Sequence, residues 1–223
     1  MSGANTPSNW ARLFRIACSL IQQVNANDRI IDHWTFGGGT AMMLQIDHRE
    51  SHDIDLFLND VQLLPFLDPK NHDFAFEIAP ADFGGDGTSF LKFAFDGIGE
   101  IDFIVRQALT ESSTTEHSIE GEHTLLETIP EIIAKKIVHR GASIQARDIF
   151  DVAAGAHQHA DAIIASLRAY PDAVQTTLEK LDKLNPEFVN RSIQALMIRD
   201  AFREISGSAI ARTKEVLIAS LGA

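Results

Sequence analysis

The chain has 223 residues, of which 45% are hydrophobic and 22% are charged, and it carries a formal net charge of -12. This composition is typical of a folded globular protein and excludes the disordered and fibrous classes. A protein that holds nucleic acid mainly through its phosphates usually has a basic face, so any such contact here needs a local cationic patch. The cations between residues 135 and 147 are the candidates.

Two features concern the cellular compartment. No apolar run reaches the roughly 20 residues that span a bilayer, and residues 1–9 are polar, without the charged-then-apolar layout of a signal peptide. The single cysteine, Cys18, excludes an internal disulfide and lies in the apolar pattern of the first expected helix. We therefore expect a cytoplasmic protein without membrane contact, in which Cys18 is a small buried side chain.

The first half of the chain alternates between helical and strand patterns. Residues 10–24 carry apolar side chains at three- and four-residue spacing, which predicts an amphipathic helix. Strands are expected at residues 34–36, 54–58, 74–78, 90–95 and 98–105, with short helices at 41–45 and 61–66. The dipeptide Asp96-Gly97 between the last two strands is typical of a hairpin turn.

The second half has a different character. Residues 107–127 begin with a stretch rich in Ser, Thr, Glu and Gln, and we expect a linker or excursion there. Thr128 and Glu131 have capping-box spacing with a proline between them, so a helix should begin at this point. Helical patterns then follow at residues 149–169, 172–184, 187–205 and 208–221. The sequence predicts an α/β (α+β) protein, with a small mixed-sheet lobe at 1–106 and a helical bundle at 128–223.

Two aspartates stand in the second expected strand. Asp53 and Asp55 are separated by one residue, so an extended chain places both carboxylates on the same face. Neighbouring carboxylates repel each other, and a divalent cation such as Mg²⁺ relieves that repulsion while also binding substrate phosphates. A solvated strand edge explains the pair equally well when it is taken alone.

A glycine turn precedes these aspartates. Gly38, Gly39 and Thr40 lie where a strand is expected to lead into a helix, and the backbone N–H groups of such a turn can hold a phosphate. A plain tight turn is the simpler explanation of the glycines by themselves, and Gly37 leaves open which pair forms the turn. Together with carboxylates on the next strand, the turn predicts a phosphate site facing a metal.

A third carboxylate is expected from a neighbouring strand. Glu100 and Asp102 lie on one face of the strand 98–105, so either could be the ligand. We favour Asp102, because it lies deeper in the apolar run and has the shorter, more rigid side chain. The other explanation is a strand residue that faces solvent.

These motifs resemble a known family. The glycines, Asp53-Ile54-Asp55 and Asp102 are similar to the pattern of polymerase-β-type nucleotidyltransferases. The segment 49–55, with the sequence RESHDID, resembles the R-x-S-x-D-x-D motif of the AbiEii/AbiGii toxin-like group within them. A second signature of that group resembles the helical half of this chain, and its residues here are Glu131, Lys136, Arg140, Arg147, Asp148 and Asp151. The resemblance covers about two thirds of the chain.

The resemblance implies an activity and a set of roles. The family transfers a nucleoside monophosphate from an NTP to an acceptor and releases pyrophosphate, and several members are toxins of toxin–antitoxin or phage-defence pairs. It implies a two-metal Mg²⁺ site at Asp53, Asp55 and Asp102, and a phosphate contact from Lys136. Gly38, Gly39, Thr40, Arg49, Ser51, Arg140 and Asp148 would complete the nucleotide site. The implied partners are an NTP, a tRNA or protein acceptor, and an antitoxin protein.

The charged residues of the helical half also have purely structural explanations. Lys136 and Arg140 could form a solvated helix face paired with acids such as Glu131. Arg147 and Asp151 are four residues apart and could form a simple helix salt bridge. His48 and His52 flank Arg49, and lone histidines are more often surface residues than ligands.

Three functions fit the sequence. The first is a toxin-type nucleotidyltransferase that modifies tRNA or another macromolecule. The second is a nucleotidyltransferase for a small molecule such as an aminoglycoside, since an acidic chain suits a cationic acceptor. The third is a non-catalytic protein that keeps the fold and binds a partner. The intact carboxylates Asp53, Asp55 and Asp102 argue against the third, and the signature in the helical half favours the first.

Overall fold

The computed structural model describes residues 8–222, and the chain forms two compact units. The first unit holds the described residues up to 41 together with Ser51–Gln107 and Glu116–Leu126. The second unit holds Met42–Glu50, Ala108–Thr115 and the described residues from 127 onward. The expectation that residues 1–9 form no signal peptide falls mostly on residues 1–7, which lie outside the described residues.

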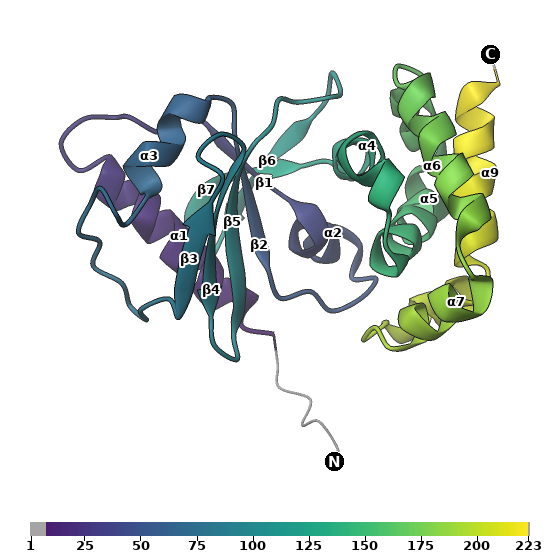
Figure 1. Cartoon of the computed structure of the whole chain (residues 1–223), viewed down its shortest axis with the longest axis horizontal. Helices are drawn as coiled ribbons and strands as arrows, with labels where there is room; N and C mark the ends of the chain where they lie inside the picture. The colour runs from purple at the N-terminus through teal and green to yellow at the C-terminus, as the bar shows by residue number, and fades with distance from the viewer. Residues whose placement is uncertain (1–7, 223) are drawn as a thin grey trace. The chain divides into compact units, whose positions relative to one another are not determined.

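The first unit is built on a seven-stranded sheet (Figure 1). Its strands are β1 Trp34–Gly37, β2 Ile54–Leu58, β3 Asp82–Gly85, β4 Phe90–Phe95, β5 Gly99–Val105, β6 Thr114–Ile119 and β7 Glu122–Glu127. They lie in the order β3-β4-β5-β2-β1-β7-β6. The pairs β2–β5 and β1–β7 are parallel, whereas β1–β2, β3–β4 and β4–β5 are antiparallel. The expected mixed sheet is confirmed.

Helix α1, Trp10–Val24, packs on one face of this sheet (Figure 1). Its inward side chains include Phe14 and Leu20, and the Phe14 ring lies 5.0 Å from that of Phe36 in β1. The expected helix at 10–24 and the burial of Cys18 are both confirmed. Burial, assisted by the charge of Glu122, raises the pKa of the Cys18 thiol to about 12, so this thiol is not a nucleophile at neutral pH.

The strand expected at 74–78 is wrong, because these residues form no strand and β3 lies further along the chain. The backbone of Ala75 bonds to the Gln23 side chain, which both donates to its carbonyl and accepts from its N–H. The rings of Phe74 and Phe76 also contact each other. A side chain of α1 therefore takes the place of a neighbouring strand.

The linker expected at 107–127 differs from the structure, because most of it is sheet. Strands β6 and β7 occupy its second part and are joined by Glu120 and Gly121, which have φ angles of 50° and 86°. Two-residue connections with positive φ are typical of β-hairpins. Strand β6 is at the edge of the sheet and is mostly exposed, so its polar composition resembles that of a loop.

Three short helical elements lie along the first half of the chain, and α2 follows β1 directly. These elements are η1 Val61–Leu63, α3 Leu64–Leu67 and α2 Gly38–Ile46. The expected helices at 61–66 and 41–45 are confirmed within one to three residues at each end. Gly97 has a φ of 68° in the turn between β4 and β5, which confirms the expected hairpin.

The second unit is helical, as expected. Its main helices are α4 Ile129–Arg140, α5 Ala146–Leu167, α6 Pro171–Lys183, α7 Pro186–Gln194, α8 Arg203–Ser206 and α9 Ala209–Leu221, with the short turns η2 Gly141–Ser143 and η3 Asp200–Phe202. Helix α5 packs against both α4 and α9, and α9 also packs against α6 (Figure 1). The Thr128 hydroxyl accepts a hydrogen bond from the Glu131 N–H and so caps α4, as its spacing predicts.

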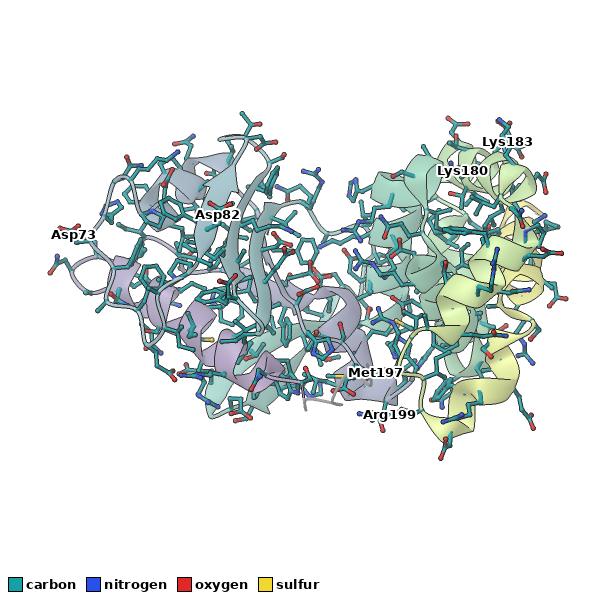
Figure 2. All side chains as sticks on the ribbon, turned by 60° about the horizontal axis from the view of Figure 1, so that its bottom comes forward. Asp73, Asp82, Lys180, Lys183, Met197 and Arg199 are labelled. Atoms are coloured by element: carbon teal, nitrogen blue, oxygen red, sulfur yellow. The ribbon has the colours of Figure 1, made fainter. Side chains whose placement is uncertain are left out.

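Residues 47–50 are tied to the stretch that follows α7. Arg199 binds Asp47 at 2.9 Å, and the Met197 carbonyl accepts a hydrogen bond from the Glu50 N–H (Met197 and Arg199 are labelled in Figure 2). Arg49 forms a β-bridge with Ile198 between these two contacts. The segment before β2 therefore belongs to the second unit.

Within the described residues, no helix has both the length and the apolar character that a membrane span requires.

We expect Leu20→Ala to lower the free energy of unfolding by about 3 kcal/mol, because Leu20 is 1% exposed and its loss leaves a cavity between α1 and the sheet. Urea-induced unfolding followed by circular dichroism measures this change. Gln22→Ala on the exposed side of α1 is the matched control and should change stability little. Equal effects of the two variants would contradict the assigned face of the helix.

Candidate active site

Four residues in cross-strand register form a row over four neighbouring strands of the sheet. Gly37 in β1 is the register partner of Asp55 in β2, Asp55 is the partner of Asp102 in β5, and Asp102 is the partner of Lys92 in β4. In these strands the flanking residues are buried on the face that α1 covers, so alternation places this row on the opposite face. The parallel pairing of β2 with β5 brings the two expected carboxylates together.

The carboxylate of Asp102 is in an unfavourable environment. Burial, together with the charge of Asp55, raises the pKa of Asp102 to about 6. Its Oδ1 atom is buried and has no hydrogen-bond partner among the described residues. A buried acceptor without a donor costs free energy, and a functional site is a common reason for retaining one.

Asp53 makes one contact that its sequence position does not predict. Its Oδ1 accepts a hydrogen bond of 3.1 Å from the backbone N–H of Glu100, so it ties the start of β2 to the start of β5. Within residues 8–222, no group of three or more His, Cys, Asp or Glu side chains is arranged to hold a metal ion. Asp55 and Asp102 form a carboxylate pair across the two strands, while the second oxygen of Asp53 takes no part in the bond to Glu100.

Glu100, the alternative to Asp102, lies further out on β5. Its carboxylate accepts a hydrogen bond from the Lys92 ammonium, and its side chain is 41% exposed against 17% for Asp102. The Lys92 Nζ atom also lies 3.5 Å from Asp102 Oδ2. Burial lowers the pKa of Lys92, but Glu100 and Asp102 together outweigh that effect and hold the pKa above its ordinary value. The geometry favours Asp102 over Glu100 as the partner of Asp55.

Lys92 is a site residue that the sequence reasoning missed. It lies in the strand FLKFAF, in which all the remaining residues are apolar. A single cation in an otherwise apolar strand is the signal that could have identified it, because such a charge needs a partner on the same face.

Gly38 begins α2 directly beside Asp55. Its φ is 72°, and a Cβ atom added there would lie 1.9 Å from Asp55 Oδ2. Glycine is therefore required for two reasons, the left-handed backbone and the close approach of the carboxylate. Gly38 and Gly39 are both partly exposed, and they place the N-terminus of α2 beside Asp55.

Thr40 and Ser51 are both buried, although a residue that contacts a nucleotide needs some exposed surface. The Thr40 hydroxyl is fully buried and donates to the backbone carbonyl of Asp53. Ser51 is 9% exposed, and its carbonyl accepts a hydrogen bond from the Ser8 hydroxyl. In this structure both residues fix the backbone on either side of the carboxylates.

The second unit contains a buried cluster of charges centred on Asp151. Arg49 binds both carboxylate oxygens of Asp151, through Nε at 2.7 Å and Nη2 at 2.9 Å. Lys136 binds Asp151 at 2.9 Å and Asp148 at 2.8 Å. His48 Nε2 lies 2.9 Å from Asp151 Oδ1, while its Nδ1 has no partner among the described residues. All five side chains were singled out in the sequence, four by the family resemblance and His48 as a neighbour of Arg49, and one network connects them.

The cluster favours the charged forms of Lys136, Asp148 and Asp151. Burial raises the pKa of Asp148 and Asp151, but Lys136 outweighs it at both residues, with Arg49 adding to the effect at Asp151. The result is a lowered pKa for both carboxyls. Burial also lowers the pKa of Lys136, which Asp151 and Asp148 raise above its ordinary value. The cluster is therefore a set of buried ion pairs whose stability depends on every partner.

Several bland explanations from the sequence are wrong. Lys136 is not on a solvated helix face, because it is 8% exposed and bound to Asp148 and Asp151. Asp151 pairs with Arg49 and Lys136 instead of forming a helix salt bridge with the exposed Arg147. His48, expected at the surface, is fully buried.

Glu131 and Arg140 occupy the two ends of α4. The Glu131 carboxylate accepts hydrogen bonds from the backbone N–H groups of Leu109 and Thr110, and it lies 3.4 Å from Lys135. Arg140 is half exposed and lies 3.7 Å from Asp148. Glu131 therefore anchors the segment before β6, while Arg140 has an accessible guanidinium.

Comparisons with known proteins agree with these motifs. A family described as "Nucleotidyl transferase AbiEii toxin, Type IV TA system" matches residues 20–215. A search of the curated proteins gave no match. Among solved structures, MenT4, a nucleotidyltransferase toxin of Mycobacterium tuberculosis, is similar with a TM-score of 0.51 at 16% identity, over 96% of this chain and 84% of that one. A proposed nucleotidyltransferase of H. pylori has a TM-score of 0.46 at 18% identity, over 96% and 98%.

The family match spans most of the chain and includes every motif described above. The protein belongs to the AbiEii nucleotidyl transferase toxin family and is a nucleotidyltransferase. Membership of a type IV toxin–antitoxin family implies an NTP substrate and a cognate antitoxin. The similarity to MenT4 adds agreement at the level of the fold.

Asp151→Asn should lower the free energy of unfolding by about 3–5 kcal/mol, because it leaves Arg49 and Lys136 buried without their shared counter-charge. Thermal or urea unfolding measures the change. Asp182→Asn removes a carboxylate of the same size from an exposed pair with Lys214 and serves as the control, with little expected effect. Near-native stability of Asp151→Asn would show that the fold does not depend on this cluster.

Asp102→Asn should stabilise the protein in EDTA, by about 2 kcal/mol at pH 8. The folded-state pKa of Asp102 is raised to about 6, so its ionisation opposes folding above that pH. The gain from the amide should be complete above pH 6 and should shrink as the pH falls toward 4. Melting temperatures across this range test the prediction, and a loss of stability at pH 8 would contradict it.

Proposed function

We propose that this protein transfers a nucleoside monophosphate from an NTP to tRNA or another macromolecule, with release of pyrophosphate, as the toxin of a toxin–antitoxin pair. The observation that carries the proposal is the pairing of Asp55 with Asp102 on the sheet face that α1 leaves uncovered. Both carboxylates lie beside a glycine turn at the start of α2. We assign this activity to the cytoplasm, where NTPs and tRNA are found.

The donor set fits Mg²⁺. Two carboxylates on adjacent strands supply the hard oxygen ligands that this ion prefers, and the buried Oδ1 of Asp102 has no hydrogen-bond partner among the described residues. We assign Asp55 and Asp102 as the principal ligands, with Asp53 contributing the oxygen that does not bind Glu100. When bound, Mg²⁺ in a two-metal arrangement would neutralise the triphosphate and lower the pKa of the attacking hydroxyl.

The chain itself would orient the NTP. The N-terminus of α2 at Gly38 and Gly39 offers backbone N–H groups and a favourable dipole to phosphate oxygens. Gly38 leaves this end of the helix open beside Asp55, where any side chain would collide with the carboxylate. Thr40 and Ser51 support this arrangement by fixing the backbone around Asp53.

The resemblance also assigns charged residues of the helical half to the nucleotide. Among them Arg140 has a half-exposed guanidinium, which leaves it accessible to a phosphate. The Lys136 ammonium already binds two aspartates, and a phosphate contact from it would require exchange of one of them. Arg49 binds Asp151 through both carboxylate oxygens, and Asp151 also binds Lys136, so we assign Arg49 to holding this cluster together.

A small-molecule acceptor is the second candidate, favoured by the net charge of -12, which suits a cationic substrate such as an aminoglycoside. The family match favours a macromolecular acceptor, since it is to a toxin family. A non-catalytic binding protein is the third candidate, and the family match argues against it.

The test is incubation of the purified protein with each α-³²P-labelled NTP, Mg²⁺ and either total tRNA or total protein. We expect label on the RNA with the wild type and a loss of at least about a hundredfold in Asp55→Asn, because that variant removes one of two principal metal ligands. Asp60→Asn, an exposed carboxylate beyond the end of β2, is the matched control and should retain activity.

Each outcome of this assay separates the candidates. Label on protein alone would replace tRNA by a protein acceptor. Transfer to an aminoglycoside and to neither macromolecule would support the small-molecule candidate. An absence of transfer to all three acceptors, with intact folding, would overturn the proposed function.

A further inference from the structure

The Lys92 ammonium lies among carboxylates at the proposed metal site. It is bound to Glu100 and lies 3.5 Å from Asp102 Oδ2, on the face where Asp102 meets Asp55. Glu100 and Asp102 therefore share this cation, which is the only Lys or Arg in β4 and β5. This ammonium supplies the positive charge that offsets Asp102 in the absence of a metal ion.

Lys92 is able to change partners. Its side chain is 38% exposed, and four flexible methylene groups carry the ammonium. Glu100 is 41% exposed and can keep the ammonium when Asp102 engages another cation. The buried Asp102, at 17% exposure, has no such freedom. A movement of the ammonium away from Asp102 therefore needs no rearrangement of the sheet.

We propose that Lys92 is a resident counter-ion that competes with the divalent metal for Asp102 and then contacts the triphosphate of the bound NTP. The inference rests on the proposed function, because it requires a metal at Asp55 and Asp102. Two like charges within a few ångströms weaken each other's binding, so Lys92 opposes the metal when no nucleotide is present. The negative charges of a triphosphate reverse this effect, because they attract the metal and the ammonium alike. Lys92 thereby makes tight metal binding conditional on NTP.

The test is direct titration with Mn²⁺, in which electron paramagnetic resonance measures the free ion. The titration is run with metal alone and then with each of the four α,β-non-hydrolysable NTP analogues. The variant is Lys92→Gln, and Lys92→Arg is the charge-conserving variant. Lys70→Gln removes the same charge from an exposed position of the first unit and is the matched control. Circular dichroism checks folding, and Lys92→Met replaces Lys92→Gln if that variant does not fold.

The affinity for Mn²⁺ alone and the affinity for Mn²⁺ with the NTP analogue should change in opposite directions. We expect Lys92→Gln to bind Mn²⁺ alone roughly fivefold more tightly than the wild type, and the NTP analogue with Mn²⁺ roughly fivefold more weakly. Lys92→Arg and Lys70→Gln should both resemble the wild type. Binding of Mn²⁺ alone by Lys92→Gln that is equal to or weaker than wild type would overturn the inference, as would unchanged analogue binding.

The same titration separates this inference from the proposed function. A wild type that binds no Mn²⁺ with or without analogue would overturn the metal site and, with it, both proposals. A wild type that binds Mn²⁺, beside a variant with unchanged affinities, would overturn the role of Lys92 alone.

Discussion

The parallel pairing of β2 with β5 is the constraint on which the proposed site depends. Its register places Asp55 against Asp102 and so holds two carboxylates close together in a partly buried setting. The sheet bears this cost because the other face of both strands is apolar and packs beneath α1. The free energy gained by hydrophobic burial on one face thus offsets the repulsion between carboxylates on the other, and such local costs are typical of functional sites.

The second unit arranges charge in the opposite way. Its buried acids are matched by buried cations, and Asp151 accepts hydrogen bonds from Arg49 and Lys136 on both oxygens. The two groups of aspartates therefore have different physical characters. The pair in the sheet leaves an oxygen of Asp102 without a donor, whereas Asp151 and Asp148 are already neutralised within the protein. Only the first group retains the unsatisfied charge that a cation requires.

Alternation and spacing were sufficient to predict the mixed sheet, α1, the hairpin at Asp96-Gly97 and the helical second half. Alternation and spacing place Asp53 and Asp55 on one face of their strand, and Glu100 and Asp102 on one face of theirs, but do not fix the β2–β5 register that brings Asp55 to Asp102. They could not identify Lys92, whose importance arises from cross-strand register, or the burial of His48, whose partner is distant in sequence. The polar composition of the edge strand β6 predicts a linker, since an edge strand need not be apolar.

The bond between Arg49 and Asp151 has a consequence for biosynthesis. These residues are 102 positions apart, and the segment Met42–Glu50 that leads into β2 belongs to the second unit. A growing chain therefore presents Asp53 and Asp55 long before the partners of the preceding segment have been translated. A chain released early, after the sheet but before α5, would keep Arg49 and His48 without their acceptor. For a toxin, this order of assembly leaves the buried charge cluster incomplete until Asp151 in α5 has been translated.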